Sequence, residues 1–267
     1  MSLRTDSATA GTPTASSPRL WPQPATGWPT STSGAAATPA WGGAATAAPT
    51  SRATLLAVVR HLGGPAVLLG HSISGGAATI AAATAPDLVA GVIELAPFTR
   101  RQPVDLELLR VRRYRTAYLR LARVMLTGNL TAWMSYLDLA IPVKPADWGT
   151  QLARIVEKLA EPGRTKVLRA MIRSDPGDAG AQLPHVNCPV LIVEGSADPD
   201  WADPRTEGER ILADLRPGLG ELAVLDGVGH YPHVQAPDQV LALALPFWPE
   251  PLRPRRLAHF GRRVTVR

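Results

Sequence analysis

The sequence has one cysteine, Cys188, and few aromatic residues, which make up 5% of its 267 positions. A single cysteine excludes an internal disulfide framework and a cysteine-rich metal site. No apolar run approaches the roughly 18–20 residues that a membrane-spanning helix needs. A charged start followed by an apolar run, which would predict a secretory signal, is also missing. We therefore expect a cytoplasmic protein without a membrane partner.

Residues 1–50 contain almost no side chains that could form a core. Ala, Thr, Pro, Ser and Gly fill 40 of these positions, and Leu3 and Leu20 are the only Leu, Ile, Val, Phe or Tyr among them. Neither a helical nor a strand period is present. We expect this low-complexity segment to be disordered, as a genuine extension or transit peptide, or to be translated out of frame. The coding DNA around codons 1–55 decides between these hypotheses.

The net charge of +6 comes from the C-terminal end, because residues 251–267 carry six Arg and no Asp or Glu. Such a basic tail can bind nucleic acid or a membrane surface. A solvated tail is favoured here, because neither interleaved aromatic residues nor a recognition helix accompanies the arginines. We expect no nucleic-acid partner, and the oligomeric state stays open.

Between residues 51 and 250, apolar runs of strand length alternate with helical patterns. The expected strands are 66–69, 89–95, 190–194 and 221–225, and the expected helices are 54–62, 75–85, 205–215 and one near 239–245. This alternation predicts an α/β fold with a mostly parallel sheet between two helical layers, a three-layer sandwich. Its core is expected to comprise residues 51–99 and 185–250.

Residues 100–184 interrupt the alternation with a helical pattern. One expected buried face joins residues at alternating spacings of three and four, namely Val111, Tyr114, Tyr118, Leu121 and Met125. A second set repeats the pattern: Trp148, Leu152, Ile155 and Leu159. Spacings of this kind are typical of amphipathic helices. We interpret the segment as a helical cap inserted into the core.

The expected strand 66–69 runs directly into the sequence GHSISGG at residues 70–76, which opens a helix of small residues. In a nucleophile elbow the central residue has a strained backbone, so the residues two positions away must be small. Gly70 and Ser74 meet this demand around Ser72. Ser74 is a poorer nucleophile candidate, because Ser72 would then replace the first small glycine. An ordinary glycine-rich turn is the alternative interpretation.

Possible partners for Ser72 follow two other strands. An aspartate, Asp198 or Asp200, comes after the expected strand 190–194, and His230 comes after the expected strand 221–225. A serine nucleophile needs a base, and the base needs an acid that orients it. Because open parallel sheets place their sites at the carboxyl ends of the strands, we expect these three side chains to meet at one edge.

From residue 51 to about residue 248 the chain resembles the α/β-hydrolase superfamily in its form with a helical cap. The resemblance is carried by GHSISGG at 70–76, CPVLIVEGSADPDWADP at 188–204 and GVGHYPHVQAPDQV at 227–240. It implies that Ser72 is the nucleophile, Asp198 the acid and His230 the base. It also implies that the Ile73 backbone amide is one oxyanion-hole donor. The first strands of that fold, and the loop that supplies the second donor, are not recognisable.

The implied activity is that of a carboxylesterase-like serine hydrolase, which cleaves an ester, lactone or amide of a small molecule through an acyl-enzyme. The expected partner is a small-molecule carbonyl substrate, and neither a metal nor a cofactor is required. A serine at the elbow argues against haloalkane dehalogenase and epoxide hydrolase chemistry. The alternative is a non-catalytic receptor or binding protein of the same fold, or a product inactivated by its damaged N-terminus.

Several polar residues near these motifs are interpreted as structural. Asp200 and Asp203 are expected to cap loops or to be solvated, and Glu94 is expected to be a partnered carboxylate within a strand, because an unpaired one would be costly. The other residues interpreted as structural are His71, His185, His233 and Cys188.

Overall fold

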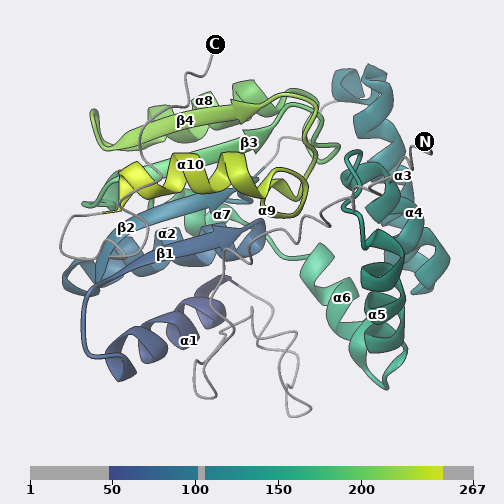
Figure 1. Ribbon diagram of the computed structural model, residues 1–267, viewed down its shortest axis with the longest axis horizontal. Coiled ribbons are helices and arrows are strands. Elements are labelled where there is room, and N and C mark those ends of the chain that lie inside the picture. The colour runs from purple at the N-terminus through teal and green to yellow at the C-terminus, as the bar shows by residue number, and fades with distance from the viewer. Residues whose placement is uncertain (1–47, 102–105, 249–267) are drawn as a thin grey trace, which may run out of the picture. The chain divides into compact units, whose positions relative to one another are not determined.

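The computed structural model describes residues 48–101 and 106–248 (Figure 1). Its sheet has four strands in the order β1-β2-β3-β4, and every neighbouring pair is parallel. The strands are β1 (Ala66–His71), β2 (Val89–Leu95), β3 (Val190–Gly195) and β4 (Gly220–Leu225). All four expected strands are therefore present, and each differs from its expected range by at most two residues at one end.

Helices cover both faces of this sheet. They are α1 (Ala48–His61), α2 (Ile73–Thr84), α8 (Pro204–Asp214), α9 (Pro232–Gln235) and α10 (Pro237–Phe247), with short 3-10 turns at Pro86–Leu88 and Leu183–His185. On one face, Val92 and Ile192 share a core cluster with residues of α1, α2 and α8. On the other, Ile93 and Val193 cluster with residues of α10, and α10 crosses the front of the sheet in Figure 1. The expected three-layer α/β sandwich is confirmed.

Helix α1 begins at Ala48, earlier than the expected start at residue 54 and inside the low-complexity segment. Pro49 lies in the first turn, where its missing N–H costs no intrahelical hydrogen bond, so the helix can begin there. The rest of the low-complexity segment and the basic tail at 251–267 lie outside the described residues.

Residues 106–180 form a helical segment between β2 and β3. It contains a 3-10 turn (Leu106–Arg110) and the helices α3 (Arg112–Thr127), α4 (Leu130–Ala140), α5 (Trp148–Ala160), α6 (Arg164–Ile172) and α7 (Gly177–Gly180). Buried residues of α3, α4 and α6 form a separate apolar cluster, against which the predicted α5 face, Trp148, Leu152, Ile155 and Leu159, packs. This segment therefore has a small core of its own.

The expected buried face of α3 is wrong for two of its members. Val111 and Tyr118 are 37% and 56% exposed, whereas Ala117 and Val124 are buried. Ala117 and Val124 lie with Leu121 in the apolar cluster of the helical segment. Their spacing also follows the helical period, so periodicity alone does not distinguish the two faces.

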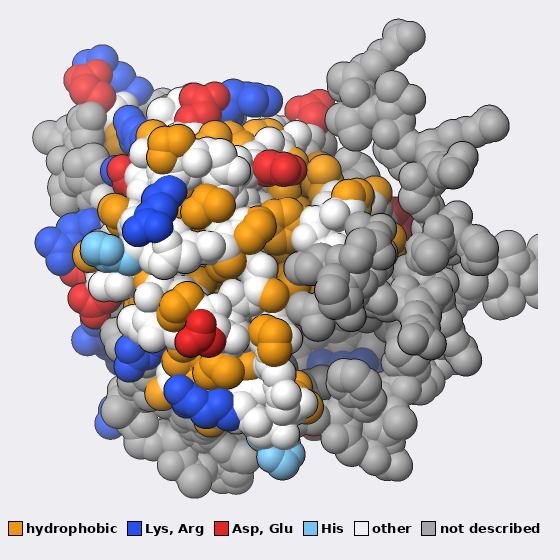
Figure 2. All heavy atoms as spheres, turned by 90° about the vertical axis from the view of Figure 1, so that its left-hand side faces the viewer, with side chains coloured by type: hydrophobic (Ala, Val, Ile, Leu, Met, Phe, Trp, Pro, Cys, Tyr) orange, Lys and Arg blue, Asp and Glu red, His pale blue; other side chains and the backbone are white. Residues whose placement is uncertain are grey.

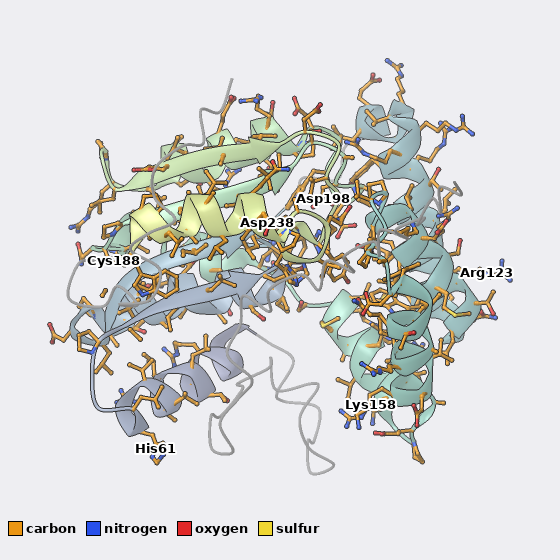
Figure 3. The ribbon with its side chains drawn as sticks, viewed as in Figure 1. His61, Arg123, Lys158, Cys188, Asp198 and Asp238 are labelled. Atoms are coloured by element: carbon orange, nitrogen blue, oxygen red, sulfur yellow. The ribbon has the colours of Figure 1, made fainter. Side chains whose placement is uncertain are left out.

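None of the helices in the described ranges is long and apolar enough to cross a membrane. Figure 2 shows the side of the molecule at the amino ends of the strands, where charged side chains border the hydrophobic ones. Cys188 lies at this end of the sheet, and Asp198 lies at the other (Figure 3). The buried Cys188 thiol precedes β3, and burial raises its pKa to about 11.

Candidate active site

Ser72 lies between the end of β1 and the first residue of α2, with φ 54° and ψ −124°. Among the described non-glycine residues only Ser72 and Ala96 have positive φ. Such a backbone conformation is costly for an L-residue and is characteristic of functional turns. Gly70 allows this turn, because a Cβ there would lie 2.4 Å from the backbone oxygen of Ser74. The local geometry is that of a nucleophile elbow.

The backbone around Ser72 is fixed from the neighbouring strand. Its N–H donates to the Leu95 carbonyl at 3.0 Å, and its carbonyl accepts from the Phe98 N–H at 3.0 Å. Ile73 is the first residue of α2, so its N–H has no intrahelical acceptor and lies at the positive end of the helix dipole. This amide can donate to an oxyanion.

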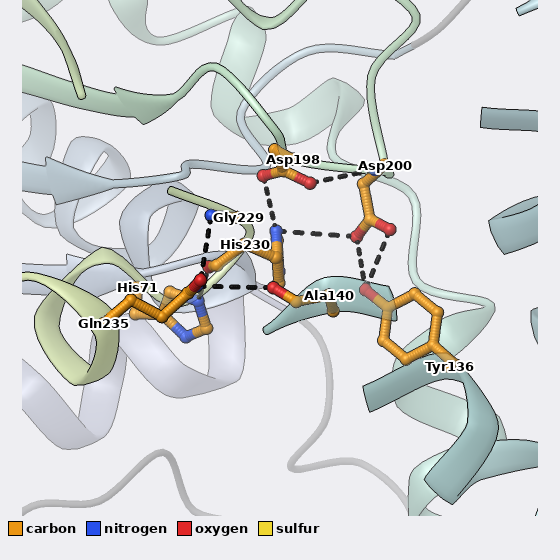
Figure 4. Close-up of polar contacts among 8 residues, drawn as sticks. All are labelled: His71, Tyr136, Ala140, Asp198, Asp200, Gly229, His230 and Gln235. Atoms are coloured by element: carbon orange, nitrogen blue, oxygen red, sulfur yellow. Dashed lines mark hydrogen bonds and ion pairs between the residues drawn. The ribbon is translucent and has the colours of Figure 1, made fainter. Parts of the chain in front are cut away.

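Asp198 and His230 meet beyond the carboxyl ends of β3 and β4 (Figure 4). His230 Nδ1 lies 2.8 Å from Asp198 Oδ2, and both residues are buried. Two of the three expected side chains are thus brought into direct contact. Two carboxylates, Asp198 and Asp200, outweigh the opposing effect of burial and raise the pKa of His230 to about 9.

The remaining link of the expected triad is not made in the described part of the chain, where no hydrogen bond joins the Ser72 hydroxyl to His230. His71, the residue before Ser72, connects the elbow to the His230 loop instead, since its Nε2 donates to the His230 carbonyl at 2.7 Å. Burial, followed by the charges of His230 and His233, lowers the pKa of His71 well below its usual value. A neutral His71 therefore connects the elbow to the loop that carries His230.

Asp200 was expected to cap a loop or carry a solvated charge, and this expectation is wrong. Its side chain is 20% exposed, and Oδ2 lies 3.6 Å from His230 Nδ1. The Tyr136 hydroxyl lies 2.8 Å and 2.9 Å from its two carboxylate oxygens. Burial raises the pKa of Asp200 to about 6. Asp203 does cap a helix, because its side chain accepts from the Thr206 N–H at the start of α8.

The region of Asp198, Asp200 and His230 is also the one cluster in the described ranges whose donor atoms could hold a metal, all within 4.8 Å of one another. All three members already have protein partners, since Asp198 accepts from His230 and Asp200 accepts from Tyr136. A metal ion would have to displace both hydrogen bonds.

Two buried glutamates lie on one face of the sheet beneath this site. Glu94 lies opposite Ile192 in the β2–β3 ladder, so Glu94 and Glu194 project from the same face. Thr79 of α2 donates to Glu94 Oε1, which partly fulfils the expectation of a partnered carboxylate. Glu94 Oε2 and both oxygens of Glu194 lack a partner among the described residues. Burial raises the pKa of Glu94 to about 7 and that of Glu194 well above its usual value.

A family profile described as the alpha/beta hydrolase family matches residues 28–243. The chain belongs to the alpha/beta hydrolase family. The match begins inside the low-complexity segment and extends through the helical segment to α10. No match is found among curated proteins.

Solved structures of this family share the fold of the chain at low sequence identity. The hydrolase BphD of Rhodococcus sp. strain RHA1, named for 2-hydroxy-6-oxo-6-phenylhexa-2,4-dienoate, superposes with a TM-score of 0.60 at 16% identity, over 75% of this chain and 70% of that one. The esterase EaEST of Exiguobacterium antarcticum gives 0.57 at 15% identity, over 74% and 73%. The alpha/beta hydrolase MGS-M2 from a Medee basin deep-sea metagenome library gives 0.54 at 21% identity, over 75% and 71%.

Proposed function

We propose that this alpha/beta hydrolase is a serine hydrolase that cleaves an ester-like bond of a small carbonyl compound, with Ser72, Asp198 and His230 as its triad. The observation that carries the proposal is the backbone of Ser72, φ 54° and ψ −124°, at the junction of β1 and α2. Esterases among the structural neighbours, such as EaEST, support the choice of an ester-like substrate.

The chemistry proceeds by acyl transfer. His230 Nδ1 is engaged by Asp198, so the proton of Ser72 passes to Nε2 as the serine oxygen attacks the carbonyl carbon. The Ile73 amide donates to the resulting oxyanion. When the tetrahedral intermediate collapses, the leaving group takes the proton from Nε2. Water then attacks the acyl-enzyme and gives a proton to the same nitrogen. As the second tetrahedral intermediate collapses, the Ser72 oxygen takes that proton from Nε2 and the acid is released.

Asp198 supports this cycle by stabilising the imidazolium that forms in each half-reaction. Its carboxylate is fully buried, where its interaction with the ring is less screened than in water. The helical segment at 106–180 serves as the cap over the site, and its α4 contacts the His230 loop, because the His230 N–H donates to the Ala140 carbonyl at 2.9 Å.

Labelling with a fluorophosphonate probe tests the proposal. The probe phosphonylates an activated serine, so we expect wild-type protein to be labelled and Ser72→Ala to be unlabelled. Ser74→Ala is the matched control, because Ser74 lies in the same turn and should not affect labelling. Labelling that persists in Ser72→Ala, or that disappears in Ser74→Ala alone, would contradict the assignment of the nucleophile.

A binding protein of the same fold is the second candidate. It is favoured by the missing hydrogen bond between the Ser72 hydroxyl and His230 in the described ranges. A folded wild-type protein that is neither labelled nor able to hydrolyse p-nitrophenyl acetate would support this candidate over the hydrolase. Folding is checked in the same samples by cooperative urea unfolding.

A further inference from the structure

His230 faces two carboxylates, although a serine triad needs only one. Nδ1 lies 2.8 Å from Asp198 Oδ2 and 3.6 Å from Asp200 Oδ2. The two aspartates lie on the same loop, where the Asp200 N–H donates to Asp198 Oδ1 at 2.9 Å. Figure 4 shows both side chains converging on the same ring nitrogen. Asp200 is therefore placed to interact with the charge that His230 acquires.

Asp200 is held in this position from outside its loop. The hydroxyl of Tyr136, on α4 of the helical segment, lies 2.8 Å and 2.9 Å from its two oxygens. Tyr136 is buried, and burial together with the charge of Asp200 raises its pKa well above the usual value, so it stays a donor. The aromatic ring also stacks on Trp133, one turn earlier in α4, with centroids 5.1 Å apart. The donor is thus fixed by packing.

The same helix contacts the backbone of the histidine. The carbonyl of Ala140, the last residue of α4, accepts from the His230 N–H at 2.9 Å. This approach depends on Gly229, where a Cβ would lie 2.2 Å from the Ala140 oxygen. Helix α4 therefore contacts His230 through its main chain at one end and, through Tyr136 and Asp200, at the imidazole.

We propose that Asp200 is a positioning residue which, held by Tyr136, acts as a second carboxylate for the His230 imidazolium and couples helix α4 to the base. This inference rests on the proposed function, because it assigns the role of Asp200 within that reaction. Asp198 orients the ring from the loop after β3. Asp200 adds a second stabilisation of the imidazolium, and this stabilisation depends on the placement of the helical segment.

The charged and titratable groups around His230 determine the sign of the expected effect. Apart from the two aspartates, the described groups that interact with the ring or its carboxylates are Tyr136 from α4, Tyr114 from α3, His71 from the end of β1, Glu194 from β3, Tyr231 from the His230 loop and His233 from α9. Burial lowers the pKa of His233 to about 4, so His233 is neutral at pH 7. The two aspartates are then the anions that stabilise the imidazolium. Removing one of them lowers the pKa of His230.

The test is a titration of His230 by NMR of the imidazole nitrogens in Asp200→Asn, Tyr136→Phe and the double variant. An opposite charge within about 4–6 Å moves a pKa by about 1–3 units. We expect Asp200→Asn to lower the His230 pKa by that amount from its value of about 9. Tyr136→Phe should lower it less, and the double variant should match Asp200→Asn, because Tyr136 acts through Asp200.

Two matched substitutions serve as controls. Asp203→Asn changes the same residue type on the same loop but at the α8 cap, and Tyr118→Phe removes a hydroxyl from an exposed tyrosine of α3. Both should leave the His230 titration and ester hydrolysis unchanged. In Asp200→Asn, kcat for p-nitrophenyl acetate, compared on the alkaline plateau where His230 is neutral in both proteins, should fall about tenfold with little change in KM. The acid limb of kcat/KM should move to lower pH with the NMR value.

The titration tests the role of Asp200, and the labelling assay tests the proposed function. A His230 pKa that is the same in Asp200→Asn and in wild type overturns the role of Asp200, whether or not the protein is active. The same holds if the double variant shifts the pKa by the sum of the single shifts. Wild-type protein that no fluorophosphonate labels overturns the proposed function and the catalytic role of Asp200 with it. A shift in both the pKa and the pH profile supports the proposal.

Discussion

Replacing Glu94 by Gln should make the protein more stable at neutral and alkaline pH. Glu94 is fully buried in β2, and burial raises its pKa from 4.5 to about 7. The folded state therefore retains a proton that the unfolded state has already released. The stability that the folded state gains from holding this proton is complete below pH 4.5 and is lost as the pH rises through about 7. Gln carries no charge at any of these pH values.

The size of the effect follows from the displacement of the pKa. At about 1.36 kcal/mol per pKa unit, a rise from 4.5 to about 7 corresponds to about 3 kcal/mol of unfolding free energy. The Gln side chain retains an oxygen that can accept from Thr79, so the hydrogen bond to α2 is kept. We expect Glu94→Gln to equal wild type near pH 4.5 and to exceed it by about 3 kcal/mol above pH 7.

Urea unfolding at several pH values between 4.5 and 8 measures this difference. Glu221→Gln is the matched control, because Glu221 is exposed on β4 and should follow the wild-type curve. Glu194 also makes stability fall with rising pH in both proteins, and the charge of Glu94 is one of the groups that raise the Glu194 pKa. The difference between variant and wild type therefore reports Glu94 together with its effect on Glu194. A Glu94→Gln protein whose stability falls with pH as steeply as wild type would refute the reasoning.

Three further outcomes are expected. Ser72→Ala and His230→Ala should each lower kcat for p-nitrophenyl acetate by several orders of magnitude, and Asp198→Asn should also be severe, as measured by initial rates above the uncatalysed blank. In wild type, kcat/KM should rise with pH through about 9, because His230 must lose its proton to act as a base; a midpoint near 6.5 would contradict the coupling to the two carboxylates. Gly229→Ala should reduce both stability and kcat, because its Cβ would lie 2.2 Å from the Ala140 carbonyl oxygen and displace the loop of His230. A variant with the same unfolding free energy and the same kcat as wild type would show that α4 can shift away without disturbing this loop.

The fold could be predicted from the sequence because its signals are local. Each strand is a short apolar run that ends in a turn motif, and β2 was predicted at Val89–Leu95, as observed. Asp198 and His230 could be predicted for the same reason, since each follows a strand whose carboxyl end lies at a common edge.

The role of Tyr136 could not be predicted in this way. It is separated from Asp200 by 64 positions, and nothing in its helix distinguishes it from a core tyrosine. Asp200 carried a weak signal, a second carboxylate two positions after Asp198 at the same sheet edge. The face of α3 was misjudged because Val111 and Tyr118 share the helical period with buried residues. Contacts between inserted helices and the core depend on how the segments dock, which periodicity does not encode.

The different supports of the two aspartates explain why they should respond differently to mutation. Asp198 is fixed by its own loop: its Oδ1 accepts from the Asp200 N–H and its Oδ2 faces His230 at 2.8 Å. Asp200 depends on a hydroxyl of another segment and lies 3.6 Å from the same nitrogen. Because Coulomb energy falls with distance and with exposure, Asp198 stabilises the imidazolium more strongly. A movement of α4 would therefore weaken the contact of Asp200 with His230 more than that of Asp198, because only Asp200 is held by a side chain of α4.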